Sequence, residues 1–415
     1  MWCTIAITKR FFYACAMKHV VIGGGAAGFF TAINLRDHYP EDEIIILEAG
    51  DRLLEKVKVS GGGRCNVTHA CFEPKELVKH YPRGEKELLG PFHKFQPGDT
   101  MAWFEERGVE LKIEDDNRVF PVTDKSQTII DCFLSEAEKK QIIIKSKSHV
   151  RGLELYHGAW KITIGGDAML ADKIYICSGS SRTMWDALRK TGHRIIRAVP
   201  SLFTFKIKDE RLHQLQGISA PHAQVKVEGK PLEATGPVLI THWGLSGPAI
   251  LKLSAWGAMP LFDARYKFLI AINWLADWSE GGVDAHFETL RQEGAKQKVL
   301  ERPEFGMPRR LWKNLAKAAR IQPKQGWPDL KKEQLVALRN QLIRCEFEVT
   351  GKSIFKDEFV TAGGVELSEV DFRTMESKLF PNLFFAGEVL NIDAITGGFN
   401  FQNAWTTAYL SAQPN

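Results

Sequence analysis

The stretch His19-Val20-Val21-Ile22-Gly23-Gly24-Gly25-Ala26-Ala27-Gly28 lies near the start of this 415-residue chain. Its apolar residues predict a strand, its glycines a tight turn, and the residues from Ala26 to Tyr39 a helix. Glycines let the chain turn sharply, let backbone approach a pyrophosphate and let helix pack close to strand, while the helix N-terminus offers free N–H groups. The stretch therefore predicts a dinucleotide-phosphate site formed by Gly23, Gly25, Ala26, Ala27 and Gly28.

An acidic residue ends the next apolar strand. That strand runs from Glu43 to Leu47 and is followed by Glu48 and Ala49, with Glu48 placed 20 residues after Gly28 (48 − 28). A carboxylate at this spacing can accept hydrogen bonds from both ribose hydroxyls and disfavours a 2′-phosphate. We expect Glu48 and Ala49 to contact the nucleotide. These residues alone do not decide whether the bound nucleotide is NAD or FAD. A Gly-rich turn can also be an ordinary strand-to-helix connection.

Length and composition set the broad class of the protein. Hydrophobic residues make up 44% of the chain, which suffices for two or three globular units. The seven cysteines are scattered without a C-x-x-C pair, so neither a disulfide framework nor a metal site is predicted. This cysteine usage fits a reducing, cytoplasmic location. No run of about 18 apolar residues occurs, so no transmembrane helix is expected.

Residues 1–16 precede a second methionine, Met17, and the first predicted strand. They hold a short apolar stretch that Lys9 and Arg10 interrupt, which is unlike a secretory signal. We expect a disordered leader or a mis-called start, and the sequence leaves open whether these residues are translated.

Positive charge is concentrated in one region. The formal net charge is +5, yet residues Phe287 to Arg344 contain 14 Lys and Arg against 6 Asp and Glu, an excess of +8 (14 − 6). A helical basic module of this kind can contact nucleic acid or an anionic membrane, although a solvated helix face is the more common reason for it.

A second glycine cluster follows the first strand-helix-strand unit, in Ser60-Gly61-Gly62-Gly63-Arg64-Cys65-Asn66. Consecutive glycines allow close backbone approach to a ligand, and arginine and asparagine donate to oxygen-rich groups. We expect cofactor contacts from Gly63, Arg64, Cys65 and Asn66, with a flexible loop as the alternative. Cys65 lacks a spaced partner and is interpreted as an unpaired structural cysteine near the cofactor.

The remaining pattern predicts the order of the other elements. Helices are expected at residues 98–113 and 131–140, and then a three-stranded meander at 149–156, 159–164 and 168–177. Val150 opens the meander, and its last strand returns to the parallel sheet at the small-residue turn Ser178-Gly179. We expect all three of these residues near the cofactor.

Two inserted segments separate this region from the C-terminus. We predict a dinucleotide-binding domain at residues 17–194, a β-rich insert at 195–273, a helical basic insert at 274–344 and the rest of the first domain at 345–415. No second strand-GxGxxG-helix unit of comparable quality occurs. A dedicated second nucleotide site is therefore not predicted.

Several motifs in this order resemble one family, the BaiN-like, aminoacetone-oxidase-type flavoproteins. The resemblance covers residue 20 to the C-terminus. The matching segments are Val21 to Gly28, Ser60 to Thr68, Thr241-His-Trp-Gly-Leu-Ser-Gly-Pro248, Val360 to Val365, Thr374 to Lys378, Phe385-Ala-Gly-Glu-Val-Leu390 and Thr396-Gly-Gly-Phe-Asn400.

The resemblance implies an α/β fold with bound FAD. It implies a Rossmann-type FAD-binding domain of the glutathione-reductase type, interrupted by an insert with a β-rich part and a helical part. It also implies oxidoreductase activity, since members are associated with reduction of carbon–carbon double bonds or with amine oxidation. The chain departs from the family pattern after Ser178, where a longer Gly-rich turn is usual, and at Asn391, where an acid is frequent.

Two C-terminal segments are expected to hold the flavin. Gly387 and Glu388 end a strand where this fold presents an acid to the ribitol chain. The turn Gly397-Gly398-Phe399-Asn400 opens the last helix, whose N-terminus would stabilise negative charge on the reduced flavin. We expect cofactor contacts from all of these residues and a catalytic contribution from Asn400.

His242 is the candidate acid or base, because histidine titrates near neutrality. A histidine hydrogen-bonded within the insert is the equal alternative.

The sequence thus predicts a cytoplasmic FAD-dependent oxidoreductase, with NAD(P)H as a transient reductant and a small organic substrate, for example one with a C=C bond. An amine oxidase that uses oxygen is one alternative, and a flavoprotein that binds or modifies RNA through the basic insert is another. The substrate, the electron donor and acceptor, the acid or base and the oligomeric state stay open.

Overall fold

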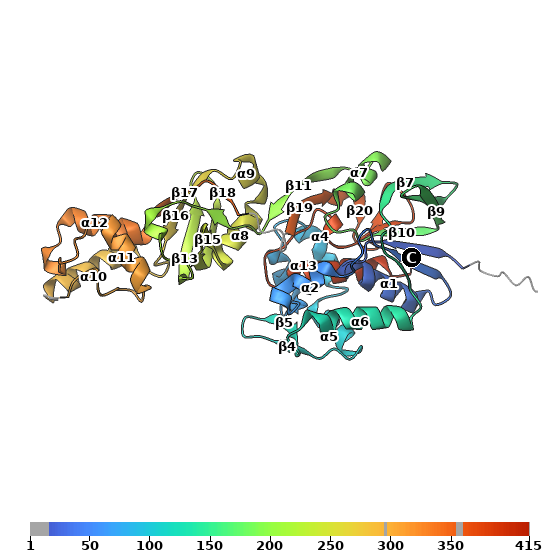
Figure 1. The fold of residues 1–415 in the computed structure, drawn as a ribbon, viewed down its shortest axis with the longest axis horizontal. Helices are drawn as coiled ribbons and strands as arrows, with labels where there is room; N and C mark the ends of the chain where they lie inside the picture. Colours follow the sequence, from blue (N-terminus) through green and yellow to red (C-terminus); the bar gives the residue numbers. More distant parts are fainter. Residues whose placement is uncertain (1–15, 294–296, 354–359, 415) are drawn as a thin grey trace, which may run out of the picture.

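The computed structural model describes residues 16–293, 297–353 and 360–414, so the predicted leader lies outside the described residues except for its last one. Figure 1 shows an elongated molecule with two parts. We call residues 16–201 and 360–414 the Rossmann part, and residues 202–353 the insert. Within the described chain, no helix is both long and apolar enough to cross a membrane.

A seven-stranded sheet lies at the centre of the Rossmann part, in the order β20-β21-β22-β10-β1-β2-β6. The strands from β22 to β6 are parallel, whereas β20 and β21 add an antiparallel edge. The strands are β1 (Lys18–Ile22), β2 (Glu43–Leu47), β6 (Ile143–Lys145), β10 (Lys173–Ile176), β20 (Val370–Asp371), β21 (Glu376–Ser377) and β22 (Leu383–Phe385). The parallel order places the carboxyl ends of the five strands from β22 to β6 at one edge.

Both faces of this sheet are covered. Val21 packs in one apolar cluster with α1 (Ala26–His38), α6 (Ser126–Lys139) and α13 (Phe399–Ser411). Val20 and Ile22 point the other way. Their cluster includes α4 (Glu85–Phe92), α7 (Arg182–Thr191) and the meander of β7 (Val150–Tyr156), β8 (Ala159–Ile164) and β9 (Asp167–Ala171). This two-sided burial explains the continuous apolar run of β1.

Smaller elements complete the Rossmann part. The helices are α2 (Glu55–Gly63), α3 (Pro74–Leu77) and α5 (Pro97–Glu105). A three-stranded sheet consists of β3 (Thr68–His69), β5 (Arg118–Pro121) and β4 (Leu111–Ile113).

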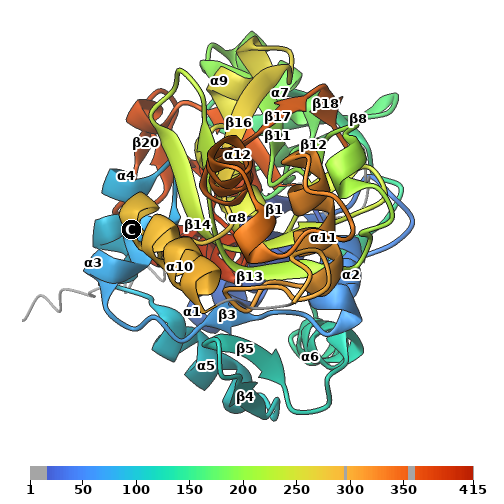
Figure 2. The same ribbon diagram turned by 90° about the vertical axis from the view of Figure 1, so that its left-hand side faces the viewer.

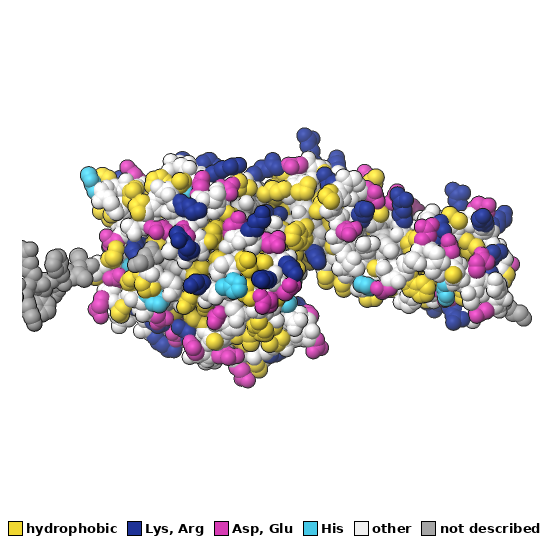
Figure 3. Space-filling model, turned by 180° about the vertical axis from the view of Figure 1, so that it is seen from behind, with side chains coloured by type: hydrophobic (Ala, Val, Ile, Leu, Met, Phe, Trp, Pro, Cys, Tyr) yellow, Lys and Arg dark blue, Asp and Glu magenta, His cyan; other side chains and the backbone are white. Residues whose placement is uncertain are grey.

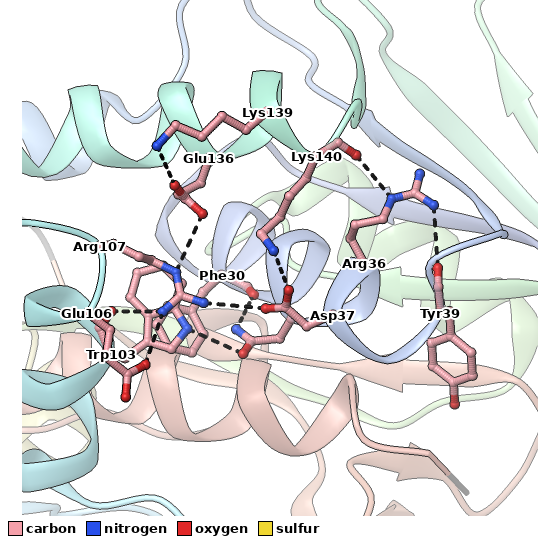
Figure 4. A network of polar contacts seen from close by, with 11 residues as sticks. Phe30, Arg36, Asp37, Tyr39, Trp103, Glu106, Arg107, Glu136, Lys139 and Lys140 are labelled. Atoms are coloured by element: carbon pink, nitrogen blue, oxygen red, sulfur yellow. Dashed lines mark hydrogen bonds and ion pairs between the residues drawn. The ribbon is translucent and has the colours of Figure 1, made fainter.

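A polar network ties α5 and α6 to α1 (Figure 4). The Arg107 guanidinium lies 3.9 Å from the ring centroid of Trp103 and 3.3 Å from the carboxylate of Asp37. Lys140, directly after α6, also pairs with Asp37. These contacts fix the outer helices against α1, which starts at the glycine turn.

The insert is built on a second seven-stranded sheet, in the order β17-β16-β13-β14-β15-β12-β18. Its strands are β12 (Phe205–Lys206), β13 (Ser219–Val227), β14 (Leu232–Ile240), β15 (Gly244–Ser246), β16 (Phe268–Asn273), β17 (Cys345–Val349) and β18 (Gly351–Lys352). Its helices are α8 (Pro248–Trp256), α9 (Ala258–Asp263), α10 (Glu280–Gln292), α11 (Arg309–Ala318) and α12 (Lys332–Ile343). Figure 2, which looks onto the end of the insert, shows α10, α11 and α12 on the side toward the viewer.

Sheet pairing moves two of the predicted domain boundaries. The expected return to the first domain at residue 345 is wrong, because Cys345–Val349 pairs along β16 and Gly351–Lys352 pairs with β12. The β-rich insert was also expected from residue 195, but β11 (Ile195–Ser201) pairs with β19 (Val360–Val365). These two antiparallel strands lead into and out of the insert.

Two predicted elements are also corrected. The helix expected at 98–113 ends with α5 at Glu105, since Gly108 adopts a φ of 79° and the chain then forms β4. The third meander strand expected at 168–177 is two strands, because the chain leaves the meander after Ala171 and enters the parallel sheet at Lys173.

Buried His193 makes stability depend on pH. It follows α7, is 1% exposed, and its ring nitrogens lie 2.9 Å from Ser377 Oγ and 3.0 Å from Thr191 Oγ1. Burial lowers the pKa of His193 from 6.5 to about 4. Below pH 6.5 the unfolded chain therefore binds a proton that the folded chain excludes, and this part of the stability is lost as the pH falls.

We predict that acidification from about pH 7 to about pH 5 removes about 2 kcal/mol of the free energy of unfolding through His193. Urea denaturation of wild type and His193→Gln at both pH values measures this, and the variant should lose less stability than wild type on acidification. Equal losses in the two proteins would contradict the assignment.

Candidate functional site

A cavity of about 990 Å³ lies where the carboxyl ends of β1, β2, β10 and β22 meet. This is the edge at which open parallel sheets bind their ligands, and the volume is at the upper end of the usual range for ligand pockets. Leu202 and Pro248 bring the insert to one wall. The predicted residues that line the cavity are Gly23, Gly25, Ala26, Ala27, Glu48, Asn66, Ser178, Gly179, Gly387, Glu388, Gly397, Gly398 and Asn400.

The glycine turn forms the floor of the cavity. Gly23 donates its N–H to the Leu47 carbonyl at 2.8 Å, which ties the turn to β2. A Cβ at Gly28 would lie 1.8 Å from the Gly23 carbonyl oxygen, so Gly28 is required for packing and not for contact with a ligand. A Cβ at Gly25 would meet no protein atom within 4 Å. The glycine at position 25 is therefore explained by a ligand that approaches the backbone.

Glu48 lies at the end of β2, on the cavity wall. One carboxylate oxygen accepts from the N–H of Gly24 and the other from the N–H of Gly50, each at 2.7 Å. These bonds hold the carboxylate beside the start of α1. The ribose hydroxyls of a nucleotide at that helix N-terminus would meet an oriented acceptor.

Glu388 is the second acid of the cavity. It lies in the short helix η5 (Gly387–Val389), accepts from the Thr361 N–H at 3.1 Å and forms an ion pair with Lys56 of α2. Lys56 also lines the cavity. Sequence reasoning missed it, because only the fold brings α2 across from η5.

The start of α13 faces the cavity with its backbone N–H groups uncapped by a side chain. Gly398 adopts a φ of 94°, and a Cβ there would lie 2.4 Å from the Thr68 carbonyl oxygen. The Asn66 amide, oriented with its oxygen toward Gly398, accepts from the Gly398 N–H at 2.9 Å. Asn66 thus supports the helix start at which the flavin is expected.

Three buried polar atoms on cavity-lining residues find no hydrogen-bond partner among the described residues. They are Ser178 Oγ, His69 Nδ1 and Asn403 Oδ1. Such atoms are costly unless a ligand or water satisfies them. Together with the open approach at Gly25 and the two oriented acids, they fit a polar dinucleotide such as FAD.

His69 is a cavity residue that the sequence did not single out. Its ring stacks on Phe399 at 4.5 Å, and His80 lies on the same phenylalanine at 4.1 Å. Burial lowers the pKa of both histidines, that of His80 to about 4. The sequence did hold one indication of this position, because His69 lies three residues after Asn66, the last residue of the glycine cluster.

Several predicted cofactor residues are not brought to the cavity. Arg64 pairs with Glu114 at 2.6 Å and with Asp124 at 3.3 Å, and its guanidinium lies over Phe120. Cys65 is fully buried, which raises the pKa of its thiol to about 12 and leaves it protonated. The others that do not line the cavity are Gly28, Ala49, Gly63, Val150 and Phe399.

The two predicted catalytic residues have other surroundings than expected. His242 is exposed in the turn between β14 and β15 and does not line the cavity. Asn400 does line it, but its amide donates to the Ala394 carbonyl at 3.0 Å and accepts from the Ala394 N–H at 2.9 Å. Asn400 therefore holds the loop before α13, and a direct role in catalysis stays a prediction.

These features define a class, the Rossmann-type FAD-binding oxidoreductases. Within it the chain belongs to the HI0933-like family, because the family model "HI0933-like protein Rossmann domain" matches residues 17–414. The predicted BaiN-type resemblance, the fold class and the assignment as an FAD-dependent oxidoreductase are thereby confirmed.

The chain is similar to curated proteins over nearly its whole length. A ribosomal RNA dihydrouridine synthase of Escherichia coli strain K12 is 26% identical over 415 residues, covering 95% of this chain and 96% of that protein. A 3-dehydro-bile acid delta(4,6)-reductase of Clostridium scindens is 24% identical, covering 95% and 97%. Among solved structures, a 3-ketosteroid-delta4-(5alpha)-dehydrogenase of Rhodococcus jostii RHA1 has a TM-score of 0.50 at 12% identity, covering 98% and 99%, which supports the fold.

We predict that Gly25→Ala retains the fold but loses FAD. Gly25 has a φ of −97°, which alanine adopts, and a methyl group there would meet no protein atom within 4 Å, so only a bound cofactor would clash with it. FAD binding should weaken by about ten-fold or more, the range expected for overpacking. The flavin-to-protein absorbance ratio after desalting and an FAD titration of the apoprotein measure this.

The matched control is Gly166→Ala in the turn between β8 and β9, where a Cβ also meets no atom within 4 Å. It should retain wild-type flavin content. A Gly25→Ala protein with full flavin content would show that the pyrophosphate lies elsewhere.

Proposed function

We propose that this enzyme reduces a carbon–carbon double bond conjugated to a carbonyl group, and that the bond belongs to a uracil base in RNA. Dihydrouridine differs from uridine by two hydrogens across a ring double bond beside a carbonyl. The bile-acid relative is named for reduction of double bonds as well. Two relatives with very different substrates thus share one reaction chemistry, which supports the same chemistry in this chain.

When bound, FAD supplies the two-electron chemistry of such a reduction, and the protein holds and orients it. We expect Glu48 to bind the ribose, Glu388 to bind the ribitol chain, and the N-termini of α1 and α13 to face the pyrophosphate and the flavin. NAD(P)H stays the proposed reductant. It would bind transiently, since the sequence has no second motif for it.

His69 is the histidine that lines the cavity, and we propose it in place of His242 as the group that handles the substrate proton. Burial lowers the pKa of His69, so its ring is neutral at neutral pH. The ring also hydrogen-bonds the backbone of Asp116, and its buried Nδ1 finds no partner among the described residues, so Nδ1 is the nitrogen left to contact a substrate group.

The observation that favours RNA over a small substrate is one basic run in the insert. Residues 305–328 contain six Lys and Arg and no Asp or Glu. Figure 3 shows dark-blue basic side chains on the insert, mixed with magenta acidic ones, as on the rest of this face of the molecule. The exposed members are Arg309, Arg310, Lys313, Lys317, Arg320 and Lys324, and no ion pair of theirs occurs among the described residues. Unpaired positive charge remote from the cavity suits a large polyanion.

A small conjugated ketone is the second candidate substrate, favoured by the bile-acid relative. The amine-oxidase alternative rests on the family resemblance alone. A cytoplasmic location stays a prediction.

We predict that the purified enzyme with NADPH forms dihydrouridine in ribosomal RNA taken from a strain that lacks its gene. Nucleoside mass spectrometry measures the product. The triple variant R309E/R310E/K313E should form dihydrouridine at about one tenth of the wild-type rate or below. The reason is that RNA affinity depends on the number of phosphates that basic side chains neutralise. Reduction of the variant's flavin by NADPH should be unchanged.

The control K75E/K86E/K94E reverses three exposed lysines of the Rossmann part and should act like wild type. No dihydrouridine, together with turnover of a small conjugated ketone, would favour the second candidate. Loss of flavin reduction in R309E/R310E/K313E would show that the basic run serves the fold and not RNA.

A further inference from the structure

A second pocket lies in the insert, away from the cofactor cavity. Its volume is about 140 Å³, and it is lined by Ala220–His222 at the start of β13, by the loop Trp274–Trp278 after β16, and by Phe305–Pro308 before α11. None of these residues lines the cofactor cavity. The proposed reduction therefore leaves this pocket unexplained.

Aromatic side chains form one wall of the pocket. Trp278 is 40% exposed although it is large and apolar, and its ring lies 4.8 Å from that of Phe305 at 78°. His286 packs against both rings and is held by Glu304 at 3.1 Å. Trp278 is thus fixed in place while a large part of it stays open to solvent.

The backbone of the pocket is strained at Phe305. Phe305 and Gly306 have φ values of 56° and 68°, and a bulky residue rarely adopts the first of these. Such strain persists where the surroundings demand it, which is often at ligand sites. Here it holds the Phe305 ring against Trp278.

Positive charge lies beside the pocket, whereas the lining itself holds the acid Asp277 and the acid Glu304 directly precedes Phe305. Arg309 directly follows Pro308 of the pocket and opens the basic run of α11, while residues 305–328 hold no acid. Asp277 is the acid among the lining residues, and its carboxylate lies 2.7 Å from the His222 ring.

We propose that this pocket binds an unpaired base of RNA, stacked on Trp278, with the flanking phosphates against Arg309 and Arg310. Aromatic stacking beside positive charge is how proteins hold single-stranded nucleic acid. The volume is too small for a drug-sized ligand. The proposal rests on RNA as the substrate of the cofactor cavity, and it adds a second base-binding site that would hold the RNA while another base reacts.

The test uses the full flavin-loaded protein and two labelled probes, a short oligouridylate and a short RNA duplex. Fluorescence anisotropy measures the dissociation constants. Trp278→Ala should weaken binding of the single strand about ten-fold or more, as loss of one stacked base does. It should leave the salt dependence unchanged, because no phosphate contact is lost. Duplex binding should change by less than about two-fold, because paired bases cannot enter the pocket.

Two variants serve as controls. Trp278→Phe keeps a stacking ring and should bind within about three-fold of wild type, because any aromatic face accepts a base. Trp256→Ala removes a tryptophan of similar exposure, 38%, from α8 outside the pocket and should bind like wild type. Photo-crosslinking of wild type to a 4-thiouridine oligonucleotide should label the peptide that contains Trp278.

The outcomes separate this proposal from the previous one. Wild-type binding that Trp278→Ala does not weaken, or crosslinks only outside the pocket, would overturn the pocket and leave RNA as a substrate. Wild type that binds no RNA at low salt would overturn both. If Trp278→Ala does not fold, the crosslink on wild type decides the question.

Discussion

The contact of Gly28 with Gly23 is the constraint on which the cofactor site depends. A Cβ at Gly28 would overlap the Gly23 carbonyl oxygen, and one at Gly23 would lie 2.4 Å from the Cys177 carbonyl oxygen. Only glycines let α1 start this close to the ends of β1 and β10. The N–H groups of α1 therefore point into the space where four strands end, and both oriented acids lie around that space.

The insert is attached to the same site through a buried ion pair. Asp393 lies in the loop before α13, is fully buried, and pairs with Arg83 while accepting from the Ser201 hydroxyl at 2.6 Å. Arg83 also donates to the Ala255 carbonyl of α8 at 2.8 Å. The loop before α13, strand β11 and the insert thus share one polar cluster, and removal of one partner would leave a buried charge. This arrangement explains how residues of the insert take part in the cavity wall.

The sequence predicts what depends on local patterns. The spacing of apolar residues and glycines predicts the strand, turn and helix from Lys18 to His38, the acid at Glu48 and the helix from Phe399. The structure contains these elements with nearly the predicted bounds. The sequence does not predict which distant segments pair. Cys345–Val349 looks like the start of the returning domain, yet it completes the insert's sheet. His242 has the side-chain chemistry of an acid or base, but it lies in an exposed turn. His69 and Lys56 reach the cavity only because elements far apart in the chain pack together.

A cavity that fits FAD and a distal surface that suits RNA lead to one hypothesis: electrons pass from the flavin to a uracil base. The most direct measurement mixes the anaerobic protein, its flavin reduced by dithionite, with uridine-containing RNA in a stopped-flow spectrometer, and follows flavin reoxidation by absorbance. We expect the flavin to be reoxidised with one dihydrouridine formed per flavin, and we expect no reoxidation with the same RNA already carrying dihydrouridine. Flavin that stays reduced with RNA but is reoxidised by a small conjugated ketone would contradict it.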